Sequence, residues 1–584
     1  MMNRYGDDKG VGSRRVMKMS FGERLIALLK EEGVSALYSQ GDLSMKDIQK
    51  HAELEGLKII GPRHEASGVF MAMGHYVLTG KPQVALGAIG PGQANLLPAA
   101  VTAAQEHIPV ILMGARRHGR VDRSIRRGRW LYAPLMPMFD AVCKFTAKVD
   151  SLDVLDEVVR EAFRQALSGT PGPVYIEYDY KLNEISADFS DLLPPARYRA
   201  LPQPAPQSSI SQAADLLRAA KSIVLLGGER VHHSRAHEAF ARLARLLKCP
   251  VLTTYGGTGA LPETDEQWLM YMSRAGQQAL ADADVLLAAG TCFPELANYG
   301  RLRHFSANDK HRQVIVIEPD AAAVGVNRPV DIALVGAVDL VLEQLIAALA
   351  GGPAFAPHRQ LPAWRQDYLR ERQAMLDGLP RTNRIYPGRL MAEARKAVPE
   401  DAIIVVDGGL TMLYQHACFQ KTSTDFLYTA NFSHLGTGLG LAIGAGIATQ
   451  GRRPICLLSG DGALGFHLMD FETAVRHKLP LVVILNDDQA LGAEMAQHME
   501  HIGHQIEVAF GPVRYSDIAI AMGGFGVYVD KLEDIVPAVR QAFASGRPAI
   551  VHVATDQDAS YAYMPPYIEE LVSWLEADPT SDGA

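Results

Sequence analysis

The chain has 584 residues, too many for one hydrophobic core, because a single core stops growing at about 250–300 residues. Its hydrophobic content of 48% and charged content of 21% are ordinary for a soluble globular protein. The formal net charge of −8 argues against a broad basic surface for a nucleic-acid backbone, so no nucleic-acid partner is expected.

Short apolar runs alternate with amphipathic stretches along the chain. Short, continuously apolar runs between helices are typical of parallel strands that are buried on both faces. The pattern therefore predicts an α/β protein with several doubly wound parallel sheets. The predicted strands cover residues 84–89, 110–113, 174–178, 223–226, 285–289, 314–317, 403–406, 455–458, 481–485 and 550–553.

Two segments rich in proline and glycine interrupt this pattern and divide the chain into three blocks. The first carries Pro194, Pro195, Pro202, Pro204 and Pro206, and the second carries Gly351, Gly352, Pro353, Pro357 and Pro362. The predicted organisation is a flexible N-terminus (1–19), a first domain (20–185), a linker (186–207), a central domain (208–350), a second linker (351–383), a third domain (384–560) and a tail (561–584).

The first and third blocks end alike, with VREAFRQALSGTPGPVYIEYD and VPAVRQAFASGRPAIVHVATD. Each reads as a helix, a turn and a strand, so the outer blocks are expected to share a fold.

The cysteines and the N-terminus indicate a cytoplasmic protein. Five cysteines lie far apart without metal-ligand spacing, which favours reduced, buried thiols. No apolar secretory signal follows the N-terminal basic residues. The most apolar stretch, residues 435–448, is rich in glycine and shorter than the roughly 18–20 residues of a membrane span, so no membrane partner is expected.

Two acidic, glycine-flanked segments follow neighbouring predicted strands. Ser459-Gly460-Asp461-Gly462 comes after the strand at 455–458 and precedes a helix predicted over 466–477, and residues 486–492 follow the next strand. Ligands of open α/β sheets bind at the carboxyl ends of strands, and Mg²⁺ prefers oxygen ligands. Asp461 and Asp488 are therefore candidate metal ligands, although an aspartate at such a turn often only caps a helix.

The text SGDGALGFHLMDFETAVRHKLPLVVILNDDQALGAE resembles thiamine-diphosphate-dependent enzymes of the acetolactate synthase-like family, which includes 2-oxoacid decarboxylases and carboligases. The resemblance implies thiamine diphosphate and Mg²⁺, with the metal held by Asp461, Asp488 and the carbonyl of Ala490. The family has asparagine where this chain has Asp488. If the family pattern is aligned on Asn486, Asp487 becomes the metal ligand instead. The alignment that makes Asp488 the ligand is preferred, because it keeps Gly492 in its expected place.

Other segments carry the same resemblance. Glu65, otherwise a first-turn helix residue, matches the carboxylate that hydrogen-bonds the pyrimidine ring and activates the cofactor. Gln93, directly after Gly90-Pro91-Gly92 in the segment called here the GPG turn, is a candidate to face the substrate. Leu435 matches the apolar residue that bends the cofactor, although packing alone explains such a residue. The implied cofactor-binding residues are Glu65, Gly409, Leu410, Thr411, Leu435, Gly460, Asp461, Gly462, Ala463, Asp488, Ala490, Leu491 and Gly492.

The substrate side is less defined. His434 is a candidate catalytic residue, and Glu494, His107 and His75 are further candidates for proton transfer. An arginine-rich region forms either an anion site or a solvated or interface loop; its members are Arg116, Arg117, Arg120, Arg123, Arg126, Arg127 and Arg129. The central domain resembles the family's Rossmann-like domain, where FAD is not expected because Thr291–Glu295 replaces the anticipated segment. Binding of coenzyme A or a nucleotide there stays open.

The resemblance names the three domains as pyrimidine-binding, central and diphosphate-binding. It implies a lyase or carboligase that acts on a 2-oxoacid or related carbonyl compound through a C2 carbanion and an enamine intermediate. An acyl-CoA- or diketone-cleaving enzyme and a non-catalytic homologue are the alternatives. A homodimer or homotetramer is implied, with Glu65 from one chain and Asp461 from its partner in each active site.

Overall fold

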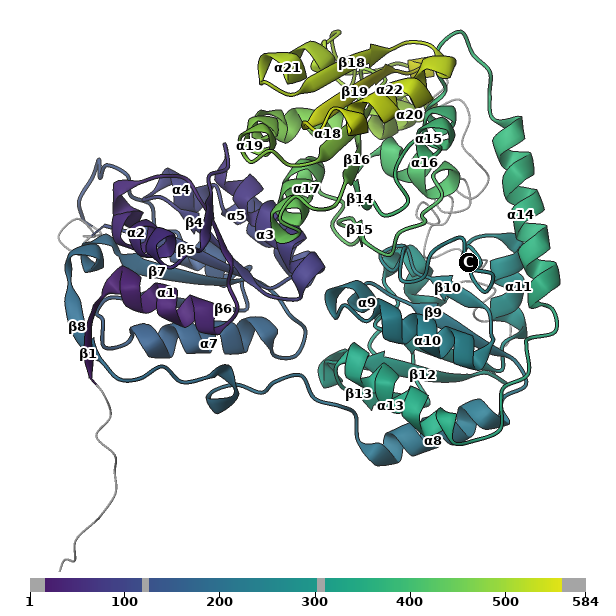
Figure 1. The fold of residues 1–584 in the computed structure, drawn as a ribbon, viewed down its shortest axis with the longest axis horizontal. Helices are drawn as coiled ribbons and strands as arrows, with labels where there is room; N and C mark the ends of the chain where they lie inside the picture. Colours follow the sequence, from purple (N-terminus) through teal and green to yellow (C-terminus); the bar gives the residue numbers. More distant parts are fainter. Residues whose placement is uncertain (1–15, 118–124, 302–309, 559–584) are drawn as a thin grey trace, which may run out of the picture.

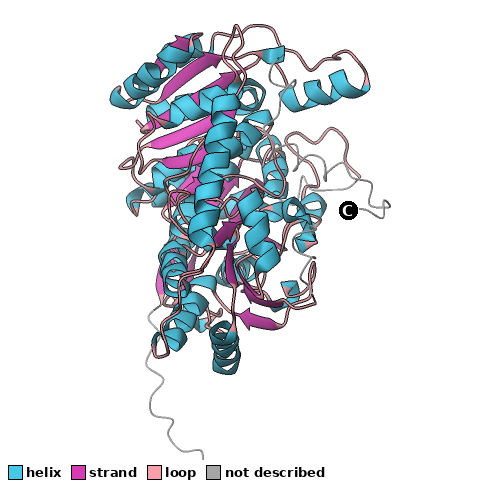
Figure 2. Cartoon of the chain, turned by 90° about the vertical axis from the view of Figure 1, so that its right-hand side faces the viewer, coloured by secondary structure: helices cyan, strands magenta, loops and turns pink. Residues whose placement is uncertain are grey.

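The computed structural model describes residues 16–117, 125–301 and 310–558, and these form three domains, each built on a parallel sheet covered by helices. Figure 1 shows the three domains in the colours of the chain, and Figure 2 shows the strands inside with helices outside them. All ten predicted strands are strands in the structure. The predicted α/β class with three parallel-sheet domains is confirmed.

The first domain has a six-stranded parallel sheet in the order β3-β2-β4-β5-β7-β6. Its strands are β2 (Ala36–Ser39), β3 (Lys58–Ile60), β4 (Gln83–Gly87), β5 (Val110–Arg116), β6 (Phe145–Val149) and β7 (Val174–Asp179). Its helices are α1 (Phe21–Glu31), α2 (Lys46–Leu54), α3 (Glu65–Thr79), α4 (Pro91–Ala94), α5 (Leu97–Gln105), α6 (Met136–Asp140) and α7 (Leu155–Leu167).

The central domain has a five-stranded parallel sheet in the order β10-β9-β11-β12-β13. Its strands are β9 (Ile223–Gly227), β10 (Val251–Thr253), β11 (Val285–Ala289), β12 (Gln313–Glu318) and β13 (Ile332–Val335). Its helices are α8 (Gln207–Ala219), α9 (Arg230–His233), α10 (His237–Leu247), α11 (Arg274–Asp282) and α13 (Val338–Ala350).

The third domain has a six-stranded parallel sheet in the order β15-β14-β16-β17-β19-β18. Its strands are β14 (Ile403–Val406), β15 (Phe426–Leu427), β16 (Ile455–Gly460), β17 (Leu481–Asp487), β18 (Phe525–Val529) and β19 (Ala549–Ala554). Its helices are α15 (Pro387–Arg395), α16 (Leu410–Cys418), α17 (Thr437–Ala448), α18 (Asp461–His467), α19 (Phe471–Arg476), α20 (Gly492–His501), α21 (Tyr515–Ala521) and α22 (Ile535–Ala544).

The two outer domains have the same strand order when their strands are counted along each domain. This confirms the shared fold expected from their similar C-terminal ends. The helix predicted over 466–477 begins earlier, at Asp461, and is divided into α18 and α19 by a 3-10 turn over Leu468–Asp470. The earlier start follows from Gly460, whose extended backbone ends β16, and from an aspartate in the first turn, which the helix dipole favours.

Regular structure also occurs inside both segments predicted as linkers. β8 (Ser186–Phe189) pairs antiparallel with β1 (Met17–Ser20) beside the first domain. α14 (Leu361–Gly378) buries Trp364 and Tyr368, and the Tyr368 ring meets the edge of Trp268. The segment was predicted as a linker because of its prolines, but proline is tolerated in the first turn of a helix, as at the start of α14.

Helices α3 and α17 pack against each other and join the first domain to the third (Figure 1). Glycines make the close approach possible. A Cβ atom at Gly444 would overlap the carbonyl of Met71, and one at Gly74 would overlap the carbonyl of Leu441. One continuous apolar core therefore includes residues of both outer domains.

Candidate functional site

A cleft lies where β14, β16 and β17 end, at the carboxyl edge of the third sheet. Parallel strands bring their carboxyl ends to the same edge, which is why segments distant in the sequence meet here. Every predicted cofactor-binding residue except Glu65 lines this cleft. Its lining consists of Gly408, Gly409, Leu410, Thr411, Leu435, Gly460, Asp461, Gly462, Ala463, Asn486, Asp488, Ala490, Leu491, Gly492 and Glu494.

Two carboxyl groups face each other in the cleft. Asp461 is buried, and its Oδ1 atom has no hydrogen-bond partner among the described residues. Burial raises the pKa of Asp461 to about 9, and the nearby carboxylates of Asp488 and Asp487 add to the rise. Two close carboxyl groups disfavour each other's ionisation, and a bound cation removes that penalty.

The structure gives different surroundings to Asp487, the last residue of β17, and Asp488, the residue after it. Asp488 lines the cleft, whereas Asp487 does not. The Asp487 carboxylate instead accepts a hydrogen bond from Nε2 of His552 on the neighbouring strand β19, at 2.5 Å, and another from the backbone N–H of Gln489. Both Asp487 and His552 are buried, so this pair holds the sheet below the cleft. The arrangement favours Asp488 as the metal ligand.

The turns of the cleft leave room for a ligand close to the backbone. Gly409 has a φ of +78°, a conformation that side chains other than glycine rarely adopt. A Cβ atom at Gly492 would lie 2.9 Å from a carboxylate oxygen of Asp488, and one at Gly460 would lie 3.1 Å from Oγ1 of Thr411. Asn486 donates a hydrogen bond to the same Oγ1 atom of Thr411 and so connects β17 to the first turn of α16.

The oxygen atoms that line the cleft suit a hard divalent cation that binds a diphosphate. Among the described residues, no three His, Cys, Asp or Glu side chains are grouped to hold a metal ion. The expected set instead combines the carboxylates of Asp461 and Asp488 with the main-chain carbonyl of Ala490, which leaves positions for phosphate oxygens and water. Mg²⁺ is commonly bound in this way, by one or two carboxylates plus phosphate.

Asp407 is a positioning residue that the sequence reasoning did not assign. Its buried carboxylate accepts hydrogen bonds from the backbone N–H groups of Gly408, Gly436 and Gly438. It thereby fastens the turn after β14 to the start of α17 and sets Leu435 against Gly408. An aspartate directly after a buried strand was the available signal.

Glu65 lies outside this cleft. It is the first residue of α3, is 9% exposed, and accepts a hydrogen bond from Nδ2 of Asn95 at 2.9 Å. The GPG turn approaches it closely, because a Cβ atom at Gly92 would lie 3.0 Å from Oε1 of Glu65. Within one chain, neither Glu65 nor the turn at Gly90–Gly92 lines the cleft of Asp461.

Gln93 borders a second cavity of about 240 Å³ at the carboxyl ends of β4 and β5. Arg116 and Arg117 line the same cavity. Arg116 forms ion pairs with Asp150 and Glu177, while Arg117 lies over the ring of Trp130. Arg120 and Arg123 of the arginine-rich region lie outside the described residues.

The candidate histidines occupy different environments. His434 lies between the outer domains, where its Nδ1 atom is 2.6 Å from Oγ1 of Thr102, and burial lowers its pKa. His75 hydrogen-bonds Tyr38 and Ser35 inside the first domain. Neither these two nor His107 lines the cleft, whereas Glu494 lies at its exposed rim.

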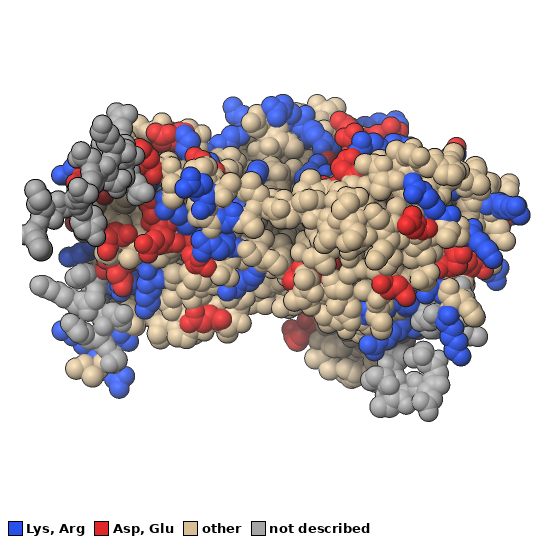
Figure 3. Space-filling view, turned by 90° about the horizontal axis from the view of Figure 1, so that it is seen from below, with Lys and Arg blue, Asp and Glu red and all other residues tan. Residues whose placement is uncertain are grey.

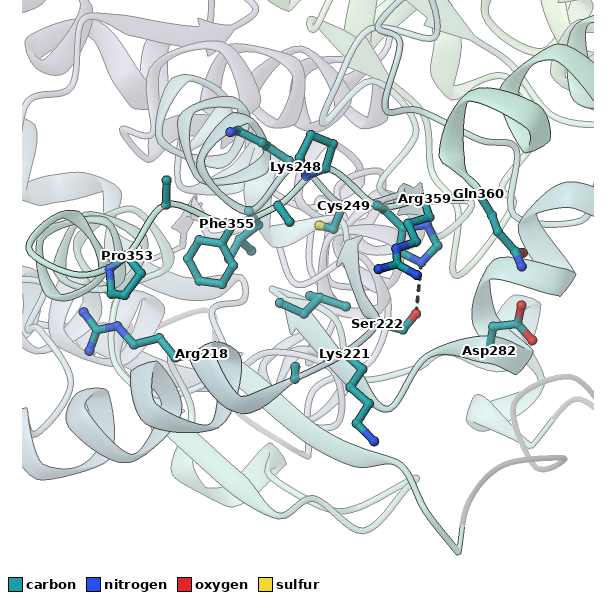
Figure 4. A pocket seen from close by; sticks show the side chains of 17 residues that line it. Arg218, Lys221, Ser222, Lys248, Cys249, Asp282, Pro353, Phe355, Arg359 and Gln360 are labelled. Carbon is teal, nitrogen blue, oxygen red and sulfur yellow. Dashed lines mark hydrogen bonds between the residues drawn. The ribbon is translucent and has the colours of Figure 1, made fainter.

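A larger cavity of about 700 Å³ lies in the central domain, at the amino-terminal edge of its sheet (Figure 4). Its walls come from the segments before β9 and β10 and from residues 353–360. The amino groups of Lys221 and Lys248 lie on opposite sides of it in Figure 4, and none of the predicted site residues lines it.

Comparisons with known proteins match each domain separately. Residues 19–126 match the family "Thiamine pyrophosphate enzyme, N-terminal TPP binding domain", residues 210–345 match its central domain, and residues 407–553 match its C-terminal TPP binding domain.

Whole-chain relatives cover nearly the full length. The acetolactate synthase large subunit IlvG of Mycobacterium tuberculosis is 28% identical over 555 residues, covering 93% of this chain and 97% of the relative. The 2-hydroxyacyl-CoA lyase 1 of Mus musculus is 24% identical, covering 94% and 96%. The sulfoacetaldehyde acetyltransferase of Castellaniella defragrans is 26% identical, covering 90% and 91%.

Proposed function

Because the chain belongs to the thiamine-diphosphate-dependent enzymes of the acetolactate synthase-like family, we propose that it is a lyase or carboligase acting on a 2-oxoacid or related carbonyl compound. The observation that carries the proposal is the cleft in which Asp461 and Asp488 meet the glycine turns at 408–409 and 460–462. Bound thiamine diphosphate supplies a nucleophilic carbon and an electron sink for chemistry next to a carbonyl.

The residues of the chain would hold the cofactor at both ends. Asp461, Asp488 and the Ala490 carbonyl would bind Mg²⁺, and the backbone N–H groups of Leu410 and Thr411 would hold phosphate oxygens at the start of α16. Glu65, held by Asn95, would hydrogen-bond the pyrimidine ring and keep a proton there.

We also propose that two chains assemble each site. Glu65 does not line the cleft of Asp461 in its own chain, so a second copy must supply the missing half. Apolar side chains exposed on the segments that follow Asp461 and Asp488 in the chain support a partner surface, since large exposed apolar patches mark interfaces. These are Phe466, Met469, Met499, Ile502, Ile506, Phe510 and Val513, which are between 37% and 59% exposed.

Sedimentation velocity tests this assembly. The chain should sediment as a dimer or a tetramer of 63.5 kDa subunits, and mixing Glu65→Gln chains with Asp461→Asn chains should restore part of the activity that each variant lacks. Restoration is expected because a mixed dimer contains one site with both native residues. A stable, active monomer would exclude the proposal.

The reaction itself can be tested by trapping covalent cofactor adducts. The enzyme should be mixed with a panel of 2-oxoacids, quenched in acid and analysed by mass spectrometry, and one donor should give an adduct. Glu65→Gln should lower turnover by at least about 100-fold, the typical contribution of a positioned proton-transfer group, while Mg²⁺ still binds. The exposed Glu53→Gln in α2 is the matched control and should keep its turnover.

An acyl-CoA-cleaving activity is the second candidate, favoured by the arginines beside Gln93. Arg116 and Arg117 border the 240 Å³ cavity, where a substrate phosphate or carboxylate would find guanidinium donors. Turnover that depends on a coenzyme A thioester, with no adduct from free 2-oxoacids, would select this activity over the first.

Other partners and the location in the cell stay predictions. In the face shown in Figure 3, basic and acidic side chains are interspersed. Within the described ranges, no helix is long and apolar enough to cross a membrane. All five cysteines are free thiols.

A further inference from the structure

A small cavity of about 30 Å³ lies where all three domains meet. We call it the junction cavity. Glu106, after α5, lines it from the first domain, and Glu229, before α9, lines it from the central domain. The third domain closes it with residues 426–430. A cavity of this volume holds one or two water-sized particles, because a water needs about 10–15 Å³ measured in this way.

The buried carboxyl group of Glu229 has no hydrogen-bond partner among the described residues. Glu229 is only 7% exposed, and both of its carboxylate oxygens are buried. Its Oε2 atom would lie 3.7 Å from a Cβ atom at Gly256, another residue of the cavity wall. A buried carboxylate without a partner is strongly unfavourable, so such a group requires an ion, a water or a proton.

Glu106 adds a second carboxylate. It is 5% exposed, and its Oε1 atom accepts hydrogen bonds from the backbone N–H groups of Asn431 and Phe432. Burial raises the pKa of Glu106 to about 7, and the charge of Glu229 contributes to the rise. The backbone donors fix this carboxylate at the wall without neutralising the cavity.

The neighbouring basic groups do not supply the missing charge. Burial lowers the pKa of His232 to about 4 and that of His233 to about 3, so both are neutral at pH 7. The pKa of His107 is lowered to about 4 for the same reason. Burial raises the pKa of Glu229 and Arg230 opposes the rise, but the Arg230 guanidinium is already paired with buried Glu318 at 2.6 Å.

We propose that the junction cavity binds one monovalent cation of the size of K⁺, held by the carboxylates of Glu106 and Glu229 where the three domains meet. A divalent or transition metal fits less well, because no three acidic, histidine or cysteine side chains are grouped as metal ligands in the described part of the chain. A monovalent cation needs less charge and accepts backbone carbonyls and water as its remaining ligands. Bound there, it stabilises the contact of the three domains.

Thermal unfolding of the full chain in different chloride salts tests the site. At about pH 8 and roughly 0.1 M ionic strength, KCl should raise the Tm above that in choline chloride by about 2–4 °C. The rise should shrink below pH 7, because Glu106 then takes up a proton that competes with the cation. Equal Tm values in KCl and choline chloride would overturn the proposal, as would a rise seen only with MgCl₂.

Variants locate the effect. Glu229→Gln and Glu106→Gln should each abolish the difference between KCl and choline chloride, whereas Glu238→Gln, at an exposed position on α10, should keep it. A difference that survives in Glu229→Gln would overturn the proposal. So would a Glu229→Gln protein that is more stable than the wild type in every salt, since Glu229 would then be protonated beside water.

Crystals grown with RbCl give a readout that does not depend on stability. An anomalous peak between Glu106 and Glu229 is expected in the wild type and should be missing in Glu229→Gln. A wild-type cavity without that peak would overturn the proposal.

Discussion

At the end of β17, one backbone step separates a side chain that faces the cleft from one that faces the interior. Asp488 lies beside Asp461, while Asp487 is bound to His552 within the sheet. Asp487 is the last residue of β17 and its side chain points toward β19, whereas Asp488 lies after the strand and lines the cleft, so two identical neighbouring side chains have different surroundings. Charge alone does not distinguish them, but their neighbours do.

This difference predicts separate effects for two matched variants. Asp488→Ala removes a candidate metal ligand and should weaken Mg²⁺ binding by at least about 10-fold, whereas Asp488→Asn keeps an oxygen ligand and should weaken it less. Magnesium titrations of cofactor binding, followed by calorimetry, measure both.

Asp487→Ala is the control for the assignment. It leaves His552 buried without its partner, so the Tm should fall while Mg²⁺ affinity stays within a few-fold of the wild type. Loss of Mg²⁺ binding in Asp487→Ala together with normal binding in Asp488→Ala would reverse the assignment.

At the scale of elements, the crossing of α3 and α17 determines where Glu65 and Leu435 lie relative to each other. α3 begins with Glu65, and α17 follows directly after Leu435 and Gly436. Glycines at the contact let the two backbones touch, so the contact depends on the absence of side chains. Both helices are buried over almost their whole length, which fits a position between two domains.

A side chain at the crossing should separate the helices. Gly444→Val places atoms against the carbonyl of Met71, which cannot move without shifting α3, and overpacking of this kind costs about 1–3 kcal/mol or more. The Tm should therefore fall, as measured by scanning calorimetry. Gly465→Ala in α18 has no atom within 4 Å of its new Cβ and should leave the Tm unchanged or raise it. Equal Tm values for the two variants would contradict this account.

At the scale of the whole molecule, part-buried ion pairs and hydrogen bonds connect the domains. Asp425 of the third domain pairs with Arg235 of the central domain at 2.7 Å and also with Arg453. The backbone N–H of Thr170 in the first domain donates to Asp320 of the central domain. The positions of the domains thus depend on a few specific polar contacts as well as on the shared apolar core.

The Asp425 pair predicts a pH dependence of stability. Burial by itself would raise the pKa of Asp425, but the guanidinium groups of Arg235 and Arg453 lower it to about 2. An aspartate has a pKa of about 3.9 in an unfolded chain, so the pair stabilises the fold above that pH and loses its effect as the pH falls toward 2. The Tm difference between wild type and Asp425→Asn should therefore be large at neutral pH and shrink below about pH 4.

Asp530→Asn, at an exposed position after β18, is the matched control for Asp425→Asn. It should differ little from the wild type at either pH, since surface charges contribute little to stability. A Tm difference for Asp425→Asn that grows toward acid pH would contradict the role given to this pair.

The sequence by itself determined the parallel strands and the shared fold of the outer domains, and its family resemblance named most of the residues that line the cleft of Asp461. It could do so because a buried strand and the turn that follows it are local patterns, and because parallel strands bring their ends to one edge. Only the tertiary structure placed Asp488 in the cleft and Asp487 against His552, left Glu65 outside the cleft of its own chain, and brought Glu106 and Glu229 to one cavity. Those outcomes depend on the directions of side chains and on contacts between domains, and neither follows from spacing along the chain.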